Sequence, residues 1–223
     1  MKKLNKNFII GGGLFLLFVI FTGLVKFVGV EPIGPLGSKV GLAGLNELFM
    51  LSSNNKVWDI ISDVIMVLAL CGALAFVVLG VVQLIKRKSL KKVDKNLYLL
   101  AGLYAVVVCF YVFFELVVIN HRPILENGEL VASFPSTHVF LVTTLVFAAL
   151  SQLSKFYIPN KNTMFIIDDI AIILETLLVV SRMLSGVHWF TDIVGALLLS
   201  ASLVFIFNGV TETFINNKDK TLD

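Results

Sequence analysis

The sequence has little charge. Only 15% of its 223 residues are Asp, Glu, Lys or Arg, whereas 57% are hydrophobic. A typical soluble domain has about 25% charged and about 45–50% apolar residues. The shortage of charge excludes a disordered chain, a coiled coil and an ordinary cytosolic globule. The sequence therefore predicts an integral membrane protein, with one membrane-embedded domain over residues 1–223.

Cysteine and histidine are also scarce, with two and three copies. Cys71 and Cys109 lie inside apolar runs, which argues against a disulfide framework and a metal knuckle and indicates buried thiols. The sequence has no His-Glu-x-x-His motif, so a metal hydrolase built on His138, His188 and Asp192 is a weak alternative. The basic residues form no patch interleaved with aromatic residues, and we expect no nucleic-acid partner.

Long apolar runs make up most of the chain. They are too uniformly apolar for amphipathic surface helices, and they lack the short alternation of membrane barrel strands. About 20 apolar residues let a helix cross the hydrocarbon core. We therefore predict an all-α polytopic membrane protein with six transmembrane helices in a bundle. The six stretches are Phe8–Val30, Asp59–Ile85, Leu97–Ile119, Val139–Leu153, Met164–Leu184 and Trp189–Val210.

The first stretch follows three lysines, as a signal peptide would. Because the run is long and no small-x-small cleavage site follows it, we interpret it as a retained span. In the connector behind it, the segment Leu42–Leu51 fits a short helix at the membrane interface and a plain connector equally well.

Basic residues are unequally divided between the two sides of the predicted membrane. Six spans put both termini on one side. Thirteen Lys and Arg residues fall on that side and four on the other, with Lys26 at a span end. Cytoplasmic loops carry the excess of basic residues in membrane proteins. We therefore expect a plasma-membrane protein with both termini in the cytoplasm, and Glu31–Lys56, Asn120–Thr137 and a turn near Ser185–Val187 outside.

Polar and ionisable residues gather at the outer ends of the last four predicted spans. Singly, each has an ordinary role: an arginine anchors at the interface, a hydroxyl caps a helix, and Arg182 can pair with Glu175 two turns earlier. Ionisable groups at membrane depth are costly and mark function by default, so many at one depth make the ordinary roles improbable together. The residues are Arg122, Ser136, Thr137, His138, Ser181, Arg182, His188 and Asp192, with His121 on the same face.

The spacing of these residues points to phosphoryl transfer. His188 and Asp192 are four residues apart and share one face of a helix, so the aspartate can orient the imidazole as a nucleophile. Arginine's planar fork matches phosphate oxygens, and a helix start near Ser136 offers free N–H groups to an anion. His138 titrates near neutral pH and can protonate a leaving oxygen.

Three segments carry a family resemblance: Arg122-Pro123, Pro135-Ser136-Thr137-His138 and Ser181-Arg182-x5-His188-x3-Asp192. They resemble the signature motifs of the type 2 phosphatidic acid phosphatases. These lipid phosphate phosphatases are related to vanadium haloperoxidases and bacterial acid phosphatases. The motifs lie within residues 115–192, and the six-span plan covers the whole chain.

The resemblance implies a role for each matching residue. His188 would become phosphorylated, Asp192 would orient it, and His138 would protonate the leaving alcohol. The resemblance also implies that no metal or other cofactor is needed. The residues that would bind the substrate phosphate are Arg122, Ser136, Thr137 and Arg182, with Ser181 behind them.

Two positions depart from the family pattern. Thr137 stands where the family usually has glycine, and Glu115 stands where it has lysine. A carboxylate cannot bind a phosphate dianion. We therefore predict that Glu115 orients Arg122 or Arg182, and that Lys39 or Lys56 supplies the missing contact.

The leading prediction is an outward-facing lipid phosphatase. Its candidate substrates are undecaprenyl pyrophosphate, phosphatidylglycerol phosphate and phosphatidic acid, and an outward site favours the first. A lipid phosphotransferase would use the same residues. A degenerate lipid-phosphate binder or transporter is the other alternative, because Glu115 and Glu175 inside spans suit a proton-coupled carrier. The expected partners are the lipid substrate and the bilayer, with no obligatory protein partner.

Overall fold

The computed structural model describes residues 5–50 and 55–216, and this part of the chain is helical. Its non-helical parts are turns and two longer irregular segments, residues 28–42 and 117–136, with three isolated β-bridges and no named strand. The all-α prediction is therefore confirmed. The helices are α1 (Lys6–Phe27), α2 (Ala43–Leu48), α3 (Lys56–Arg87), α4 (Lys95–Leu116), α5 (Thr137–Gln152), α6 (Lys161–Leu184) and α7 (Phe190–Asn216).

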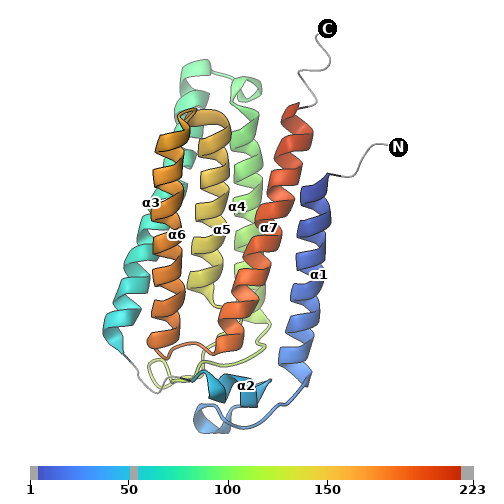
Figure 1. Cartoon of the computed structure of the whole chain (residues 1–223), viewed down its shortest axis with the longest axis vertical. Coiled ribbons are helices and arrows are strands. Elements are labelled where there is room, and N and C mark those ends of the chain that lie inside the picture. The colour runs from blue at the N-terminus through green and yellow to red at the C-terminus, as the bar shows by residue number, and fades with distance from the viewer. Residues whose placement is uncertain (1–4, 51–54, 217–223) are drawn as a thin grey trace.

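Five helices are long and apolar enough to cross a membrane: α1, α3, α4, α5 with the π turn to Tyr157, and α7. The helix α6 has 24 residues but carries Asp168, Asp169 and Glu175. It runs beside α5 in the bundle (Figure 1). Five of the six predicted spans are thus helices long and apolar enough to cross a membrane, and the spanning role of α6 stays a prediction.

The outside of the bundle is apolar. Large hydrophobic side chains such as Leu16, Leu68 and Ile173 are exposed along the long helices, and an apolar surface of this extent fits lipid, not water. Cys71 and Cys109 also lie on this surface as free thiols. Their predicted burial is wrong, because most residues of a spanning helix face lipid and only a narrow stripe faces other helices.

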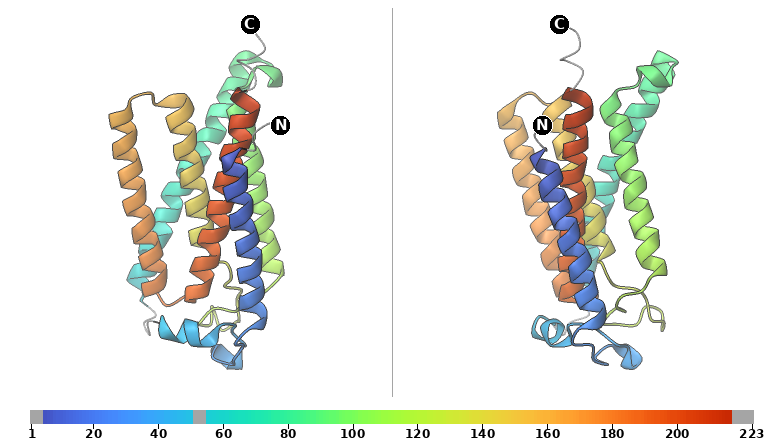
Figure 2. Two further views of the ribbon diagram at one scale, coloured as in Figure 1. Left: turned by 45° about the vertical axis from the view of Figure 1, so that its right-hand side comes forward. Right: turned by 90° about the vertical axis from the view of Figure 1, so that its right-hand side faces the viewer.

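The core lies around α7, which packs against α1, α4 and α5 (Figures 1 and 2). Buried side chains from these helices fill it, including Phe18, Leu100, Phe140 and Leu199. The helices α3 and α4 diverge from α7 toward the end that holds both termini (Figure 2). Because α7 is central, its first residues lie among the ends of several helices.

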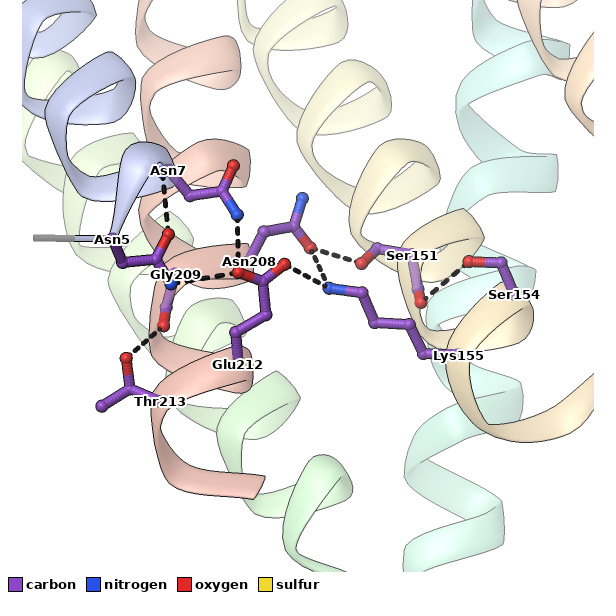
Figure 3. A network of polar contacts seen from close by, with 9 residues as sticks. All are labelled: Asn5, Asn7, Ser151, Ser154, Lys155, Asn208, Gly209, Glu212 and Thr213. Atoms are coloured by element: carbon purple, nitrogen blue, oxygen red, sulfur yellow. Dashed lines mark hydrogen bonds and ion pairs between the residues drawn. The ribbon is translucent and has the colours of Figure 1, made fainter. Parts of the chain in front are cut away.

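Polar contacts tie α1 to α7 near the termini (Figure 3). The side-chain amides of Asn5 and Asn7 each donate to Oε2 of Glu212 at 3.0 Å. Lys155, in the turn after α5, places Nζ 3.4 Å from Oε1 of the same carboxylate. Glu212 therefore joins three segments at the end of the bundle opposite α2 (Figure 1).

Close packing of α1 on α7 leads to a first prediction. A Cβ at Gly11 would lie 2.7 Å from Cγ1 and 2.9 Å from the backbone N of Ile206. We expect Gly11→Leu to lower the free energy of unfolding by about 1–3 kcal/mol, as overpacking does. Gly12→Leu is the matched control, because nothing lies within 4 Å of a Cβ there. Thermal unfolding in detergent measures both, and equal stability of the two variants would contradict the packing.

The opposite end of the bundle is covered by α2 (Figure 1). The short helix Ala43–Leu48 confirms the helical alternative for the segment Leu42–Leu51, whose last residue lies outside the described part. Buried Asn46 of α2 bonds twice to the first turn of α7: its Oδ1 accepts from N of Thr191, and its Nδ2 donates to Oγ1 of Thr191, both at 3.1 Å. The cover is therefore fixed to the start of α7.

Candidate active site

The tight turn between α6 and α7 brings two predicted site residues to one end of the bundle. Gly186 has φ +70°, a left-handed conformation that favours glycine. Ser185 N donates to the carbonyl of Ser181 at 2.8 Å, and Ser185 Oγ donates to the carbonyl of Arg182 at 3.1 Å. Arg182 in the last turn of α6 and His188 before α7 are thereby placed close together.

His188 and Asp192 form the pair expected from their spacing. His188 Nδ1 lies 3.3 Å from Oδ2 of Asp192, and both side chains are almost completely buried. The same Oδ2 accepts from N of Trp189 at 2.9 Å, which fixes the carboxylate. His188 Nε2 is buried and has no hydrogen-bond partner among the described residues. One ring nitrogen is therefore held and the other is free to react.

The surroundings of His188 keep its ring neutral. Burial lowers its pKa well below the usual value, and the positive charges of Arg182 and then Arg122 lower it further. The backbone of Ser133 has a smaller effect, which raises the pKa of His188. With its proton on Nδ1, toward Asp192, the neutral ring has a lone pair on Nε2. This is the form that a nucleophile needs.

Arg182 is held by α3. Its NH1 donates to Oδ1 of Asp59 at 2.6 Å and to Oγ of Ser62 at 3.0 Å. The arginine side chain is 1% exposed, and that of Asp59 is 42% exposed. The alternative pairing with Glu175 is wrong, because Glu175 accepts instead from the hydroxyl of Thr143. α3 packs closely against the last turn of α6 and supplies the partner.

Arg122 lies in an irregular hairpin between α4 and α5. Its N donates to the carbonyl of Val131 at 3.0 Å, and its NH1 lies 2.9 Å from Oε2 of Glu126. The hairpin is tied to the start of α7, because Nε1 of Trp189 donates to the carbonyl of His121 at 2.7 Å. Arg122 is thereby held beside the α6–α7 turn.

The start of α5 completes the cluster. Ser136 is the N-cap residue, and its N donates to the carbonyl of Asp192 at 3.0 Å. Thr137 is the first residue of the helix, and the following His138 places Nε2 2.7 Å from Oδ1 of Asp63. The predicted residues of this motif are thus brought to the His188–Asp192 pair.

Several buried polar atoms of the cluster lack partners. Buried polar groups are normally hydrogen-bonded, so this concentration calls for a ligand. The arginine Nε atoms and serine hydroxyls are the donors that phosphate oxygens accept from. Among the described residues, these unpartnered atoms are Arg122 Nε, Ser133 Oγ, Ser136 Oγ, Ser181 Oγ, Arg182 Nε, His138 Nδ1, His188 Nε2 and the acceptor Asp192 Oδ1.

Three residues of α3 belong to the cluster but were not predicted: Asp59, Ser62 and Asp63. The two aspartates are four residues apart at the start of an apolar stretch. Carboxylates at membrane depth are themselves a functional signal, so the sequence indicated that these two aspartates belong to a functional site. It could not say which residues they pair with, because that depends on how α3 packs.

The surroundings of Glu115 differ from those predicted from the sequence. Its side chain is exposed, and neither arginine pairs with it: Arg122 pairs with Glu126 and Arg182 with Asp59. The predicted pairing is therefore wrong. The reason is that α4 ends at Leu116, so residues 115 and 122 do not share a helix face. Lys39 and Lys56 are exposed, and their predicted phosphate contact stays a prediction.

Within residues 5–50 and 55–216, no group of three or more His, Cys, Asp or Glu side chains is arranged to hold a metal ion. The positive charge beside His188 comes from Arg182 and Arg122. The chemistry that these residues support is nucleophilic attack by a neutral imidazole on the phosphorus of an anionic group whose oxygens are held by arginines.

Two comparisons with known proteins bear on the cluster. Residues 117–215 match the PAP2 superfamily. The fold is similar to a crystal structure described as the first transmembrane PAP2 type phosphatidylglycerolphosphate phosphatase from Bacillus subtilis. The TM-score is 0.61 and the identity 20%, over 92% of this chain and 96% of that chain. No curated protein matches the chain significantly in sequence.

Proposed function

We propose that the chain is a membrane lipid phosphatase of the PAP2 superfamily, because residues 117–215 match that family and the fold is similar to a transmembrane PAP2 type phosphatase. It hydrolyses a phosphate monoester or pyrophosphate of a membrane lipid through a phosphohistidine at His188. The observation that carries the proposal is the buried His188, whose Nδ1 is held by Asp192 while Nε2 is free. The two nearby arginines act on the same ring.

The proposed reaction has two steps. Nε2 of His188 forms a bond to phosphorus while the bond from phosphorus to the leaving oxygen breaks, and His138 gives a proton to that oxygen. Water then attacks the phosphohistidine, giving its proton to His138 and releasing inorganic phosphate and free His188. Arg122, Arg182, Ser136 and the backbone N–H of Thr137 bind the phosphate oxygens, whose negative charge grows in the transition state.

Two grooves along α4 support a lipid substrate. One is apolar, lies between α3, α4 and α5, and is lined by residues such as Tyr104, Tyr111 and Leu141. The second, also lined by Tyr111, is partly polar and reaches Glu115, Ser133 and Pro135. Lipid chains in the bilayer could therefore lie along α4 while the headgroup reaches the start of α5.

A panel of lipid phosphates tests the proposed function. Purified protein in detergent is assayed for phosphate release from phosphatidic acid, phosphatidylglycerol phosphate and undecaprenyl pyrophosphate. Release from at least one supports the proposal, and the outward orientation favours the third. Transfer of phosphate to a lipid acceptor instead of water would identify a lipid phosphotransferase.

One observation favours the degenerate binder as second candidate. Each arginine is already paired with a carboxylate, Arg122 with Glu126 and Arg182 with Asp59, and Glu115 replaces the lysine of the family pattern. Such a site could bind a lipid phosphate without cleaving it. Binding of the panel lipids with no phosphate release would select this alternative.

The orientation is a second prediction. Thirteen Lys and Arg residues lie on the side of the two termini and four on the other side. This bias supports cytoplasmic termini and an outward site in the plasma membrane. In a background without Cys71 and Cys109, Glu129→Cys should react with an impermeant thiol reagent in intact cells, and Lys91→Cys should not. Both positions are exposed. Labelling of the Lys91→Cys variant from outside would reverse the orientation.

Metal independence is a third prediction. Because two arginines supply the positive charge beside His188, we expect phosphate release to continue at an unchanged rate with excess EDTA. The measurement compares initial rates with and without the chelator. Loss of activity that zinc or magnesium restores would instead favour a metal hydrolase.

A further inference from the structure

Two of the three histidines have one ring nitrogen next to an aspartate and the other buried without a partner. In the first pair, Asp192 holds Nδ1 of His188 at 3.3 Å. In the second, Asp63 lies 2.7 Å from Nε2 of His138, and Nδ1 of His138 has no partner among the described residues. The second pair is formed between α3 and α5, far apart in the sequence.

We propose that Asp63 is a positioning residue that orients His138 so that its Nδ1 protonates the leaving oxygen of the substrate. This inference rests on the proposed phosphatase function and adds a residue that the motifs do not contain. The aspartate itself does not touch the substrate. It acts only through the ring of His138.

The positions of the two side chains fit this role. The side chain of Asp63 is 56% exposed, whereas that of His138 is 15% exposed. The carboxylate therefore lies on the open side of the ring, and the free nitrogen lies on its buried side. His138 is also near enough to Arg182 and His188 for their charges to interact.

The charge of Asp63 fits the role as well. A histidine that donates a proton is an imidazolium beforehand, and a carboxylate 2.7 Å away compensates that charge. The other charged groups that act on His138 are Asp59 of α3 and Arg182 of α6. Asp59 bonds directly to Arg182, which leaves Asp63 as the carboxylate bonded to the ring.

One stretch of α3 thus holds two parts of the site. Asp59 and Ser62 bind Arg182, and Asp63 binds His138. An exposed ion pair usually contributes little stability. The Asp63–His138 pair differs from such a surface bridge, because the far side of the ring faces the buried cluster. Its expected effect is on one chemical step, not on folding.

The test compares two leaving groups. A lipid alkoxide needs a proton as it departs, whereas 4-nitrophenolate is a stable anion and does not. In Asp63→Ala we expect kcat/KM to fall about 100-fold for dioctanoyl phosphatidic acid, as loss of general-acid help does, and less than about 3-fold for 4-nitrophenyl phosphate. The ratio kcat/KM reports the step in which His188 is phosphorylated.

Two further variants sharpen the test. Asp63→Glu keeps a carboxylate and should recover much of the lost activity toward the alkyl ester. Asp169→Ala is the matched control, because Asp169 is an exposed aspartate near the other end of α6, and it should change neither rate.

The outcomes separate this inference from the proposed function. An equal loss of kcat/KM with both esters would indicate a merely structural role for Asp63. No loss with either ester would show that Asp63 has no role in catalysis. Either result overturns the inference, while the wild type remains an active phosphatase. A wild type that cleaves neither ester also overturns it. The proposed function fails only if the whole lipid panel is negative.

Discussion

The variant His188→Ala should release phosphate from lipid phosphates at least about 10⁴-fold more slowly than the wild type. His188 is the nucleophile of the proposed mechanism, and its Nε2 is buried and free while Asp192 holds Nδ1. Initial rates with the lipid substrate measure the loss. In the wild type, radiolabelled phosphate should be trapped on the protein as an acid-labile adduct, and the variant should trap none.

The third histidine provides the control. His121 lies at the same end of the molecule, and its contact to the cluster is made by the backbone carbonyl, which accepts from Trp189. His121→Ala should therefore keep wild-type activity. Thermal unfolding of both variants checks that they fold. A folded His188→Ala protein that turns over at the wild-type rate would refute the phosphohistidine mechanism.

The second large effect is expected for Arg182→Lys, which should lower kcat/KM about 10²–10³-fold, as loss of a transition-state donor does. Lysine keeps the positive charge but lacks the planar fork. In the wild type, NH1 is engaged by Asp59 and Ser62, while Nε is buried without a partner. We expect Nε to be the donor that binds the phosphate.

Arg182→Lys is preferred to removal of the charge. Removing the charge would leave Asp59 and Ser62 without their partner and would confuse binding with folding. Arg87→Lys is the matched control, because Arg87 pairs with Asp94 at the other end of α3, and it should keep full activity. If Arg182→Lys also kept full activity, Arg182 would have no role in binding the phosphate.

The sequence predicted those contacts that lie within one helix or one turn. The pair His188–Asp192 follows from a spacing of four residues, and the structure has it. The placement of Ser136 at a helix start was also predicted, because the polar motif directly precedes an apolar stretch, and Ser136 is the N-cap of α5. Such features depend only on the geometry of one helix.

The predictions that failed involved partners on other segments. Glu115 was expected at an arginine because a continuous helix would put residues 115 and 122 on one face, but α4 ends at Leu116. Glu175 was a candidate partner for Arg182 on the same helix, but Asp59 of α3 takes that place. A local pattern cannot say which neighbouring helix is nearer.

The sequence by itself therefore determined that the protein is a helical membrane protein with its reactive residues at one end of the bundle. Hydropathy, basic residues and motif spacing are local properties, and they suffice for that. Only the tertiary structure decided that α3 supplies Asp59 to Arg182 and Asp63 to His138. These pairs join residues far apart in the chain, and they form because α3 packs against α5 and α6.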